Sequence, residues 1–257
     1  MLFCALLMAQ AHSQTITVAA AADLRPALEE ISSRFQTQSG VHVSAIYGSS
    51  GNFSQQIQNG APFDLFFSAN IEYPHKLENA GLTVPGSYYE YARGKIVLLV
   101  PLSSTLDLKK GLKALQDPTI KKVAIAEPSH APYGQAAVAA LKTENIYDKV
   151  SPKLVTGENI SQAASFVLSG AADAGIVALS LALSPSIKGQ VQFAEIPASD
   201  YPPIQQACVV LKSSKQQKLA VEFESFVKSE EATQILRRYG FEGPAAVKTN
   251  DKAKPVP

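Results

Sequence analysis

Cysteine is scarce in this sequence. Its 257 residues include two, Cys4 and Cys208, so we expect no disulfide framework and a fold stabilised by its hydrophobic core. The residues before Cys4 match a lipoprotein acylation box poorly, and we expect no lipid anchor. Cys208 stands alone in the apolar stretch 207–211, which is typical of a small buried hydrophobe rather than a nucleophile.

Charge of either sign is not in excess. The 23 Lys and Arg residues nearly balance the 22 Asp and Glu residues, for a net charge of +1. No sequence-wide field therefore exists to hold a polyanion, and we expect no nucleic-acid partner. With 46% hydrophobic and 18% charged residues, the composition is that of a globular protein with room for one large domain or two lobes.

Motifs of common catalytic and metal sites are missing as well. The sequence has no Gly-x-Ser-x-Gly elbow, Walker loop or His-Glu-x-x-His segment. Its histidines have no metal-ligand neighbour at helical spacing, so we expect no zinc site. They are His12, His42, His75 and His130. A hydrolase remains the main alternative from another functional class, although the sequence offers it little support and we expect no enzyme.

The N-terminus begins with an apolar run, residues 2–9, followed by small residues. Ala11 and Ser13 occupy positions like those of a signal-peptide cleavage site. The run is too short to span a bilayer and lacks a basic region before it, which leaves the true start of the signal open. We predict that residues 1–13 are a signal peptide and that the protein is exported.

Strand-like apolar runs alternate with helical patterns along the chain. This alternation predicts an α/β architecture with mainly parallel sheets. The opening unit is a strand at 15–20 followed by a helix that Gly40 ends. A similar series starts at 96–100, and the proline-containing segment 196–203 predicts a connection back to the first part.

Four segments between a strand and a helix are small and rich in hydrogen-bond donors. They are Ala21-Ala22-Asp23, Gly48-Ser49-Ser50-Gly51, Pro132-Tyr133-Gly134 and Gly157-Glu158-Asn159-Ile160. In open α/β sheets, ligands lie beyond the carboxyl ends of strands, where helix N-termini converge. Unpaired N–H groups and the positive end of the helix dipole make such turns anion sites without a cationic side chain. The pattern therefore predicts an anion held by neutral donors.

Each of these segments also has an ordinary structural interpretation. The Gly-Ser-Ser-Gly segment is a common turn with a serine N-cap, and Tyr133 alone is typical of a surface or core tyrosine. Asp23 has the position of a helix N-cap whose carboxylate accepts from the amides of the next turn. Since a carboxylate that points at an anion repels it, we expect Asp23 to contribute its backbone N–H, with its side chain turned toward its own helix.

Several stretches, taken in order and spacing, resemble the periplasmic molybdate-binding proteins of ABC importers. They are ITVAAAADL (16–24), YGSSGNFSQQIQNGAPFDLFFSA (47–69), EPSHAPYGQAA (127–137) and RRYGFE near the end. The segment 59–69 is highly characteristic of that family. The resemblance implies a solute-binding protein that captures molybdate or tungstate for an ABC importer. It also implies a membrane permease as partner, a periplasmic location and no cofactor, and we expect a monomer.

The same resemblance implies the fold and the lobes. The family has a type II periplasmic-binding fold, in which two α/β lobes joined by a hinge close on the oxyanion in a central cleft. We expect lobe I to comprise 14–93 plus 204–243, and lobe II to comprise 94–203. We expect residues 244–257 to form a disordered tail.

Carried over position by position, the resemblance assigns ligand contacts to both lobes. Ser50 matches the hydroxyl donor of the family. Tyr133 and Ile160 match positions whose backbone amides, and in some members the tyrosine itself, face the anion. Ala22 and Asp23 match the first-loop position.

Two departures from the family pattern leave the choice of anion open. The family commonly has Ser, Thr or Asn where this chain has Asp23, which leaves only the backbone donor there. Some members carry a ligand-contacting tyrosine where this chain has Ala178, so Tyr133 is expected to supply that hydroxyl. Sulfate and phosphate therefore remain alternatives to molybdate and tungstate. A bound cation would require clustered carboxylates, and the four segments supply only Asp23 and Glu158.

Overall fold

The structure, a computed structural model, describes residues 14–244, which contain two five-stranded sheets. The predicted signal peptide at 1–13 and nearly all of the predicted tail lie outside the described residues. The strands of the first sheet are β1 (Thr15–Ala21), β2 (His42–Gly48), β3 (Leu65–Ser68), β4 (Tyr89–Gly94) and β10 (Ile204–Val210). Those of the second sheet are β5 (Ile96–Pro101), β6 (Val123–Ala126), β7 (Leu154–Gly157), β8 (Ala174–Ala178) and β9 (Val191–Glu195).

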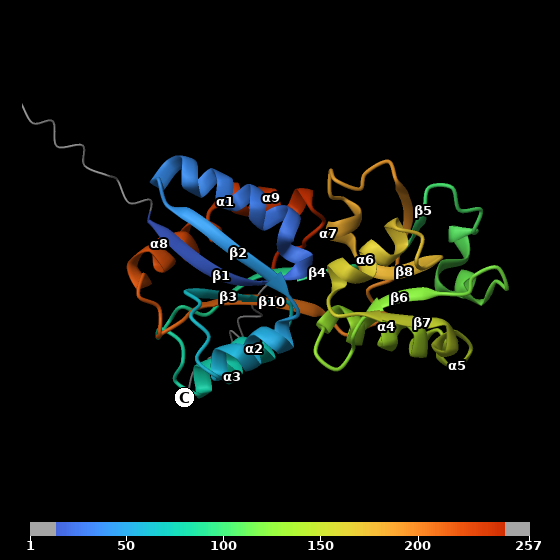
Figure 1. The fold of residues 1–257 in the computed structure, drawn as a ribbon, viewed down its shortest axis with the longest axis horizontal. Coiled ribbons are helices and arrows are strands. Elements are labelled where there is room, and N and C mark those ends of the chain that lie inside the picture. Colours follow the sequence, from blue (N-terminus) through green and yellow to red (C-terminus); the bar gives the residue numbers. More distant parts are fainter. Residues whose placement is uncertain (1–13, 245–257) are drawn as a thin grey trace, which may run out of the picture.

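The two sheets have matching topologies, β2-β1-β3-β10-β4 and β7-β6-β8-β5-β9. The chain passes to the second sheet between β4 and β5 and returns between β9 and β10. We call the part around the first sheet lobe I and the part around the second lobe II; they lie side by side in Figure 1. The returning segment is the one that its prolines predicted, at 196–203.

Both sheets are mixed, so the prediction of mainly parallel sheets is wrong. In lobe I, β1 is parallel to β2 and β3, whereas β10 is antiparallel to β3 and β4. In lobe II, β6 is parallel to β7 and β8, whereas β5 is antiparallel to β8 and β9. The strands that begin just after the chain crosses between lobes, β5 and β10, enter from the inter-lobe side and so run against their neighbours.

Helices cover both faces of the first sheet (Figure 1). One face carries α1 (Arg25–Ser39), α8 (Gln217–Val227) and α9 (Glu230–Arg238), and the other carries α2 (Ser50–Gln58) and α3 (Glu72–Asn79). Helix α1 buries Leu28, Ile31 and Phe35 on one side. It ends at Gly40, which has a φ of 74°, a left-handed conformation that glycine adopts at little cost. The helix predicted from this spacing is confirmed.

The second sheet is covered in the same way (Figure 1). Its helices are α4 (Pro132–Thr143), α5 (Tyr147–Val150), α6 (Ile160–Leu168) and α7 (Leu179–Ala182). Short 3-10 segments complete the fold: η1 (Ala22–Leu24), η2 (Leu108–Gln116) and η3 (Ser151–Lys153). The apolar core of lobe II includes Ala22 and Ala69 of lobe I, so the two lobes are packed against each other.

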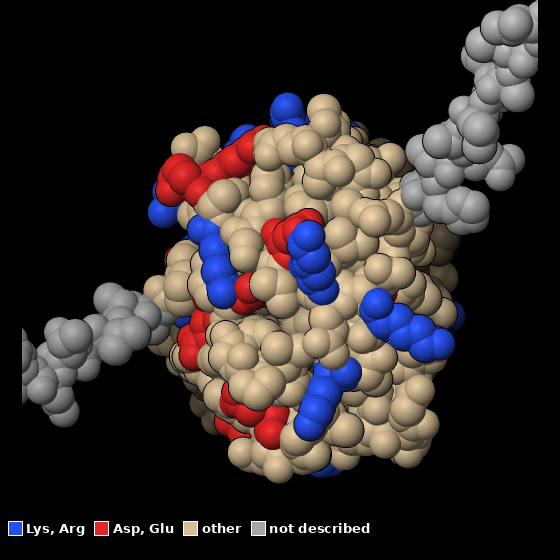
Figure 2. All heavy atoms as spheres, turned by 90° about the vertical axis from the view of Figure 1, so that its left-hand side faces the viewer, with Lys and Arg blue, Asp and Glu red and all other residues tan. Residues whose placement is uncertain are grey.

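The described surface and core agree with the composition. Cys208 is a free, fully buried thiol in β10, as predicted. Figure 2 shows the end of the molecule formed by lobe I, where acidic and basic side chains are interspersed without a broad area of one sign. None of the helices within 14–244 has the length and apolar character needed to cross a membrane.

Candidate anion site

The predicted site residues stand where strands give way to helices. Ser50 and Ile160 are the first residues of α2 and α6, and Tyr133 is the second residue of α4. Amides in the first turn have no acceptor within their own helix. Ala22 and Asp23 lie in η1, directly after β1. All five residues are buried, with at most 3% of their surface exposed.

Hydrogen bonds between the lobes bring the first segment against the two segments of lobe II. The Tyr133 hydroxyl donates to Oδ2 of Asp23 over 2.9 Å. The Ser161 hydroxyl, next to Ile160, donates to the carbonyl oxygen of Ala22 over 3.1 Å. A third contact comes from Ser180, whose hydroxyl donates to the carbonyl oxygen of Asp23 over 2.7 Å. The N-termini of α4 and α6 therefore converge on η1.

The second segment meets lobe II through His130. The Gly51 amide donates to the carbonyl oxygen of His130 over 3.0 Å, and the Ser49 hydroxyl lies 2.8 Å from Nδ1 of His130. We call this set, Ser49, Gly51 and His130, the α2 clasp. Since the clasp and η1 both join lobe I to the α4 N-terminus, the structure brings all four predicted segments together between the lobes.

Two glycines permit this close approach. A Cβ atom at Gly51 would lie 2.7 Å from the His130 carbonyl oxygen. A Cβ atom at Gly94 would overlap the Tyr133 hydroxyl and lie 2.8 Å from Nε2 of Gln206. The packed arrangement of the lobes thus depends on the missing side chains at these two positions.

The adjacent serines of the Gly-Ser-Ser-Gly turn have different roles. Ser49 is the N-cap of α2, and its hydroxyl accepts from the Asn52 amide over 3.4 Å, which confirms a serine N-cap in this turn. The Ser50 hydroxyl accepts from the Ala69 amide over 2.9 Å. Because a hydroxyl has one donor besides its acceptor lone pairs, Ser50 keeps a proton with which to donate, together with its helix-start amide.

Asp23 is the one charged side chain among the predicted residues, and its environment differs from the prediction. It is not a helix N-cap, because those positions belong to Ala21 for η1 and Leu24 for α1. Its Oδ2 accepts from Tyr133 and, over 2.7 Å, from Nε2 of Gln206, whereas its buried Oδ1 has no hydrogen-bond partner. The side chain is therefore directed mainly at other elements, rather than only at its own helix.

Burial raises the pKa of the Asp23 carboxyl from its ordinary value of 3.8 to about 6. The hydrogen bonds from Gln206 and Tyr133 to Oδ2 oppose the rise, and the nearby backbone of Asp23 and Leu24 opposes it less strongly. Desolvation has the larger effect on the pKa because the carboxyl group is completely buried. The Tyr133 pKa is well above its ordinary value, through burial and the nearby Asp23, so its phenol is a neutral donor.

Two functional candidates, Gln206 and Tyr91, were not found from the sequence. Tyr91 donates to Oε1 of Gln206 over 2.6 Å, so the amide of Gln206 presents Nε2 to Asp23 and, at 3.0 Å, to the Tyr133 oxygen. We call Asp23, Tyr133, Gln206 and Tyr91 the carboxyl network. The signal available in the sequence was a glutamine within an apolar strand. Gln206 lies in β10 and is fully buried.

The sequence predicted that the Tyr133 hydroxyl donates to the anion, whereas in this structure it donates to Asp23. Its proton is engaged with Asp23, so in this arrangement the hydroxyl is not a free donor for an anion. Ala178, where a tyrosine was expected in some family members, ends β8 next to α7. The neighbouring Ser180 of α7 donates to the backbone of Asp23 instead.

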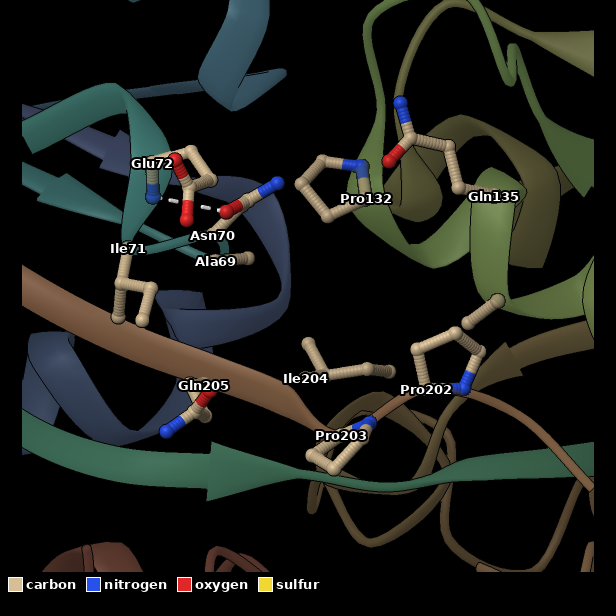
Figure 3. Close-up of a pocket in the computed structure, with 11 residues that line it drawn as sticks. Ala69, Asn70, Ile71, Glu72, Pro132, Gln135, Pro202, Pro203, Ile204 and Gln205 are labelled. Carbon is tan, nitrogen blue, oxygen red and sulfur yellow. Dashed lines mark hydrogen bonds between the residues drawn. The ribbon is translucent and has the colours of Figure 1, made fainter. Parts of the chain in front are cut away.

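A cavity of about 190 Å³ lies beside the site at the seam of the lobes. Figure 3 shows Pro132 and Gln135 of α4 facing Asn70 and Glu72 of lobe I across it. The returning segment, residues 202–205, also lines the cavity. Its walls include Pro132 and Ala69, which are direct neighbours of Tyr133 and of the Ser50 hydroxyl. The five predicted residues do not line it, because the lobes close over them.

The hydrogen-bond donors of the site are neutral, and its one charged side chain, Asp23, is an acceptor. Amides and hydroxyls from both lobes surround the site, and the main influences on the pKa of Asp23 are burial and hydrogen bonds rather than a cationic side chain. Within 14–244, no group of three or more His, Cys, Asp or Glu residues is arranged to hold a metal ion. Chemically, such a place suits a small anion that accepts several hydrogen bonds.

Comparisons with known proteins agree with this geometry. Residues 16–242 match the family model for bacterial extracellular solute-binding proteins. The molybdate-binding protein ModA of Rhodobacter capsulatus is 38% identical over 226 residues, 88% of this chain and 87% of that protein. ModA of Azotobacter vinelandii is 36% identical over 236 residues, 92% and 93% of the two chains. The solved periplasmic molybdate-binding protein of A. vinelandii matches with a TM-score of 0.82 at 36% identity, over 89% of this chain and 99% of that one.

Proposed function

Because the chain belongs to the family of bacterial extracellular solute-binding proteins, we propose that it captures molybdate or tungstate and hands it to the permease of an ABC importer. Its fold, two mixed α/β lobes, is that of the periplasmic molybdate-binding protein of A. vinelandii, as the resemblance led us to expect. The chain is a binding protein and not an enzyme, like the relatives that it matches. It carries no cofactor of its own.

The observation that carries this proposal is the meeting of neutral helix N-termini from both lobes in a buried place. Ala22, Asp23, Ser50, Tyr133 and Ile160 are the residues we propose as ligand contacts. An oxyanion there would accept from the amides at the starts of α2, α4 and α6 and from the Ser50 hydroxyl. Several charge-assisted bonds of about 1.5–3 kcal/mol each are enough for micromolar binding or better.

The two crossings of the chain between the sheets support the proposed lobes, 14–93 plus 204–243 and 94–203, with a hinge at the crossings. Export through a cleaved signal at 1–13, release into the periplasm and action as a monomer belong to the same proposal. They rest on the family match and on the apolar N-terminal sequence.

Phosphate is the alternative ligand that a specific observation favours. Asp23 places a carboxylate oxygen without a partner among the donors, and such an acceptor suits an anion that carries a proton, as phosphate does at neutral pH. Sulfate differs from molybdate mainly in size.

Calorimetric titration with molybdate, tungstate, sulfate and phosphate tests the proposal and ranks the ligands. We expect molybdate or tungstate to bind most tightly. Ser50→Ala should weaken that binding by about tenfold, because one donor to a buried charge is lost. Ser33→Ala, the same change on the exposed side of α1, should bind like the wild type. Absence of heat with all four anions would contradict the proposed function.

A further inference from the structure

Oδ1 of Asp23 is a buried polar atom without a partner. The residue has no exposed surface, so water does not satisfy this oxygen from outside. Buried polar atoms nearly always have hydrogen-bond partners, and an exception in a site points to a proton or ligand that completes it. The other oxygen, Oδ2, already accepts from Tyr133 and Gln206.

Within the described residues 14–244, no positively charged side chain pairs with this carboxyl group. The titratable groups that face it are the phenols of Tyr133 on α4 and Tyr91 on β4, whose pKa values burial holds well above the ordinary value. Gln206 of β10, Ser161 of α6 and Ser180 of α7 are neutral, and α6 and α7 contain no charged residue. On α1, Arg25 is engaged elsewhere, with its guanidinium 4.2 Å from the Tyr47 ring centre and 3.7 Å from Glu29.

A dianion held by the same segments would face this carboxyl group in a place closed to water. Two negative groups so close, without a cation, repel each other strongly because the screening is weak. One proton on the carboxyl group removes this repulsion and gives Oδ1 a hydrogen bond that it can donate to the anion. Since Oδ2 accepts two donors, the proton belongs on Oδ1, which turns this oxygen from an acceptor into a donor.

We propose that the protein binds a dianion that carries no proton of its own, such as molybdate, together with one proton, which resides on Oδ1 of Asp23 and is donated in a hydrogen bond to the anion. The proposal rests on the proposed function, since it concerns the same site. The only chemical change is a proton transfer: an O–H bond forms on Oδ1 with a proton from solvent on binding, and it breaks when the proton returns to solvent on release. Asp23 is thus a specificity residue that makes affinity depend on pH.

Whether affinity rises or falls with pH follows from the pKa of the Asp23 carboxyl group in the ligand-free protein. Its pKa of about 6 means that Asp23 is mostly ionised above that pH and has to take up a proton when the dianion binds. Affinity for a dianion should therefore fall by about tenfold per pH unit well above pH 6, and should level off below it. Tyr133 and Tyr91 stay neutral throughout this range, because their pKa values are raised.

Calorimetry of the wild-type protein with molybdate, at about pH 8 in two buffers of different ionisation enthalpy, counts the protons directly. We expect an uptake close to one proton per molybdate bound. Binding without proton uptake would overturn the proposal and leave the proposed function intact. Absence of molybdate, tungstate, sulfate and phosphate binding would instead remove the proposed function, and this inference with it.

Asp23→Asn assigns the proton to its residue. The amide keeps the shape of the carboxyl group and does not titrate, so proton uptake should vanish and affinity should become nearly independent of pH between about 6 and 8.5. Asp148→Asn makes the same change at an exposed position of α5 and should keep the wild-type uptake. An Asp23→Asn protein that still takes up one proton would show that another group carries it.

Discussion

Two of the contacts between the lobes differ in chemistry, the α2 clasp and the carboxyl network. The clasp consists of a backbone hydrogen bond and a Ser49–His130 contact, and a missing side chain at Gly51 makes it possible. The network has a buried carboxyl group, two phenols and an amide. The clasp therefore depends on shape, whereas the network contains a carboxyl group whose protonation changes with pH. Substitutions in each can separate the two effects.

Gly51→Ala in the α2 clasp is expected to change molybdate affinity the most. Its methyl group would meet the backbone oxygen of His130 at 2.7 Å, so the lobes cannot close as they do here. Molybdate affinity should fall by about a thousandfold or more, because only the closed form surrounds the anion. Within lobe I the added Cβ would also lie 2.9 Å from the Tyr73 hydroxyl, the end of a flexible side chain that can move. Folding should therefore suffer little, since alanine is favoured over glycine inside a helix by up to about 1 kcal/mol.

Calorimetry gives the affinity of this variant, and small-angle X-ray scattering shows whether molybdate still compacts it. Gly243→Ala, where an added Cβ meets no atom within 4 Å, is the control. Wild-type affinity in Gly51→Ala would mean that the clasp is not formed in the loaded protein.

The network should dominate the pH dependence of stability in the ligand-free protein. The pKa of Asp23 is 3.8 ordinarily and about 6 in the fold, so the folded state binds more protons than the unfolded state in this window. Its contribution is fully present below pH 3.8 and is lost as the pH rises through 6. The loss amounts to about 3 kcal/mol, at about 1.4 kcal/mol per pKa unit.

Urea unfolding at about pH 4.5 and 8 measures this effect, with Asp23→Asn as the comparison. Relative to that variant, the wild type should lose free energy of unfolding at the higher pH. Equal pH profiles for the two proteins would show that the carboxyl group is not desolvated.

The smallest effect is expected from His130→Ala, which removes the imidazole from the clasp and leaves the backbone bond to Gly51. A neutral, partly exposed hydrogen bond contributes about 0.5–1.5 kcal/mol, so molybdate affinity should fall by about threefold. Calorimetric titration with molybdate, run beside the wild type, measures this difference. A loss as large as that of Gly51→Ala would mean that the imidazole, not the backbone fit, holds the clasp.

Local pattern was enough to predict much of the fold. The spacing of apolar residues predicted α1, Gly40 predicted its end, and the prolines of 196–203 predicted the return to lobe I. The antiparallel direction of β5 and β10 was not predicted. Strand direction depends on how the chain crosses between lobes, and an apolar run has the same pattern in either direction.

The neutral segments and the family stretches also allowed the site residues to be proposed from the sequence, because donors at strand ends are a local feature. The partners of Asp23 could not be predicted in this way. Tyr133 and Gln206 are 110 and 183 residues away from it in the chain. Amino-acid order by itself determined which elements form and which of them begin with free amides. Only the packing of one lobe on the other decided that a carboxyl group would be buried among those amides, because desolvation and long-range hydrogen bonds arise when distant segments meet.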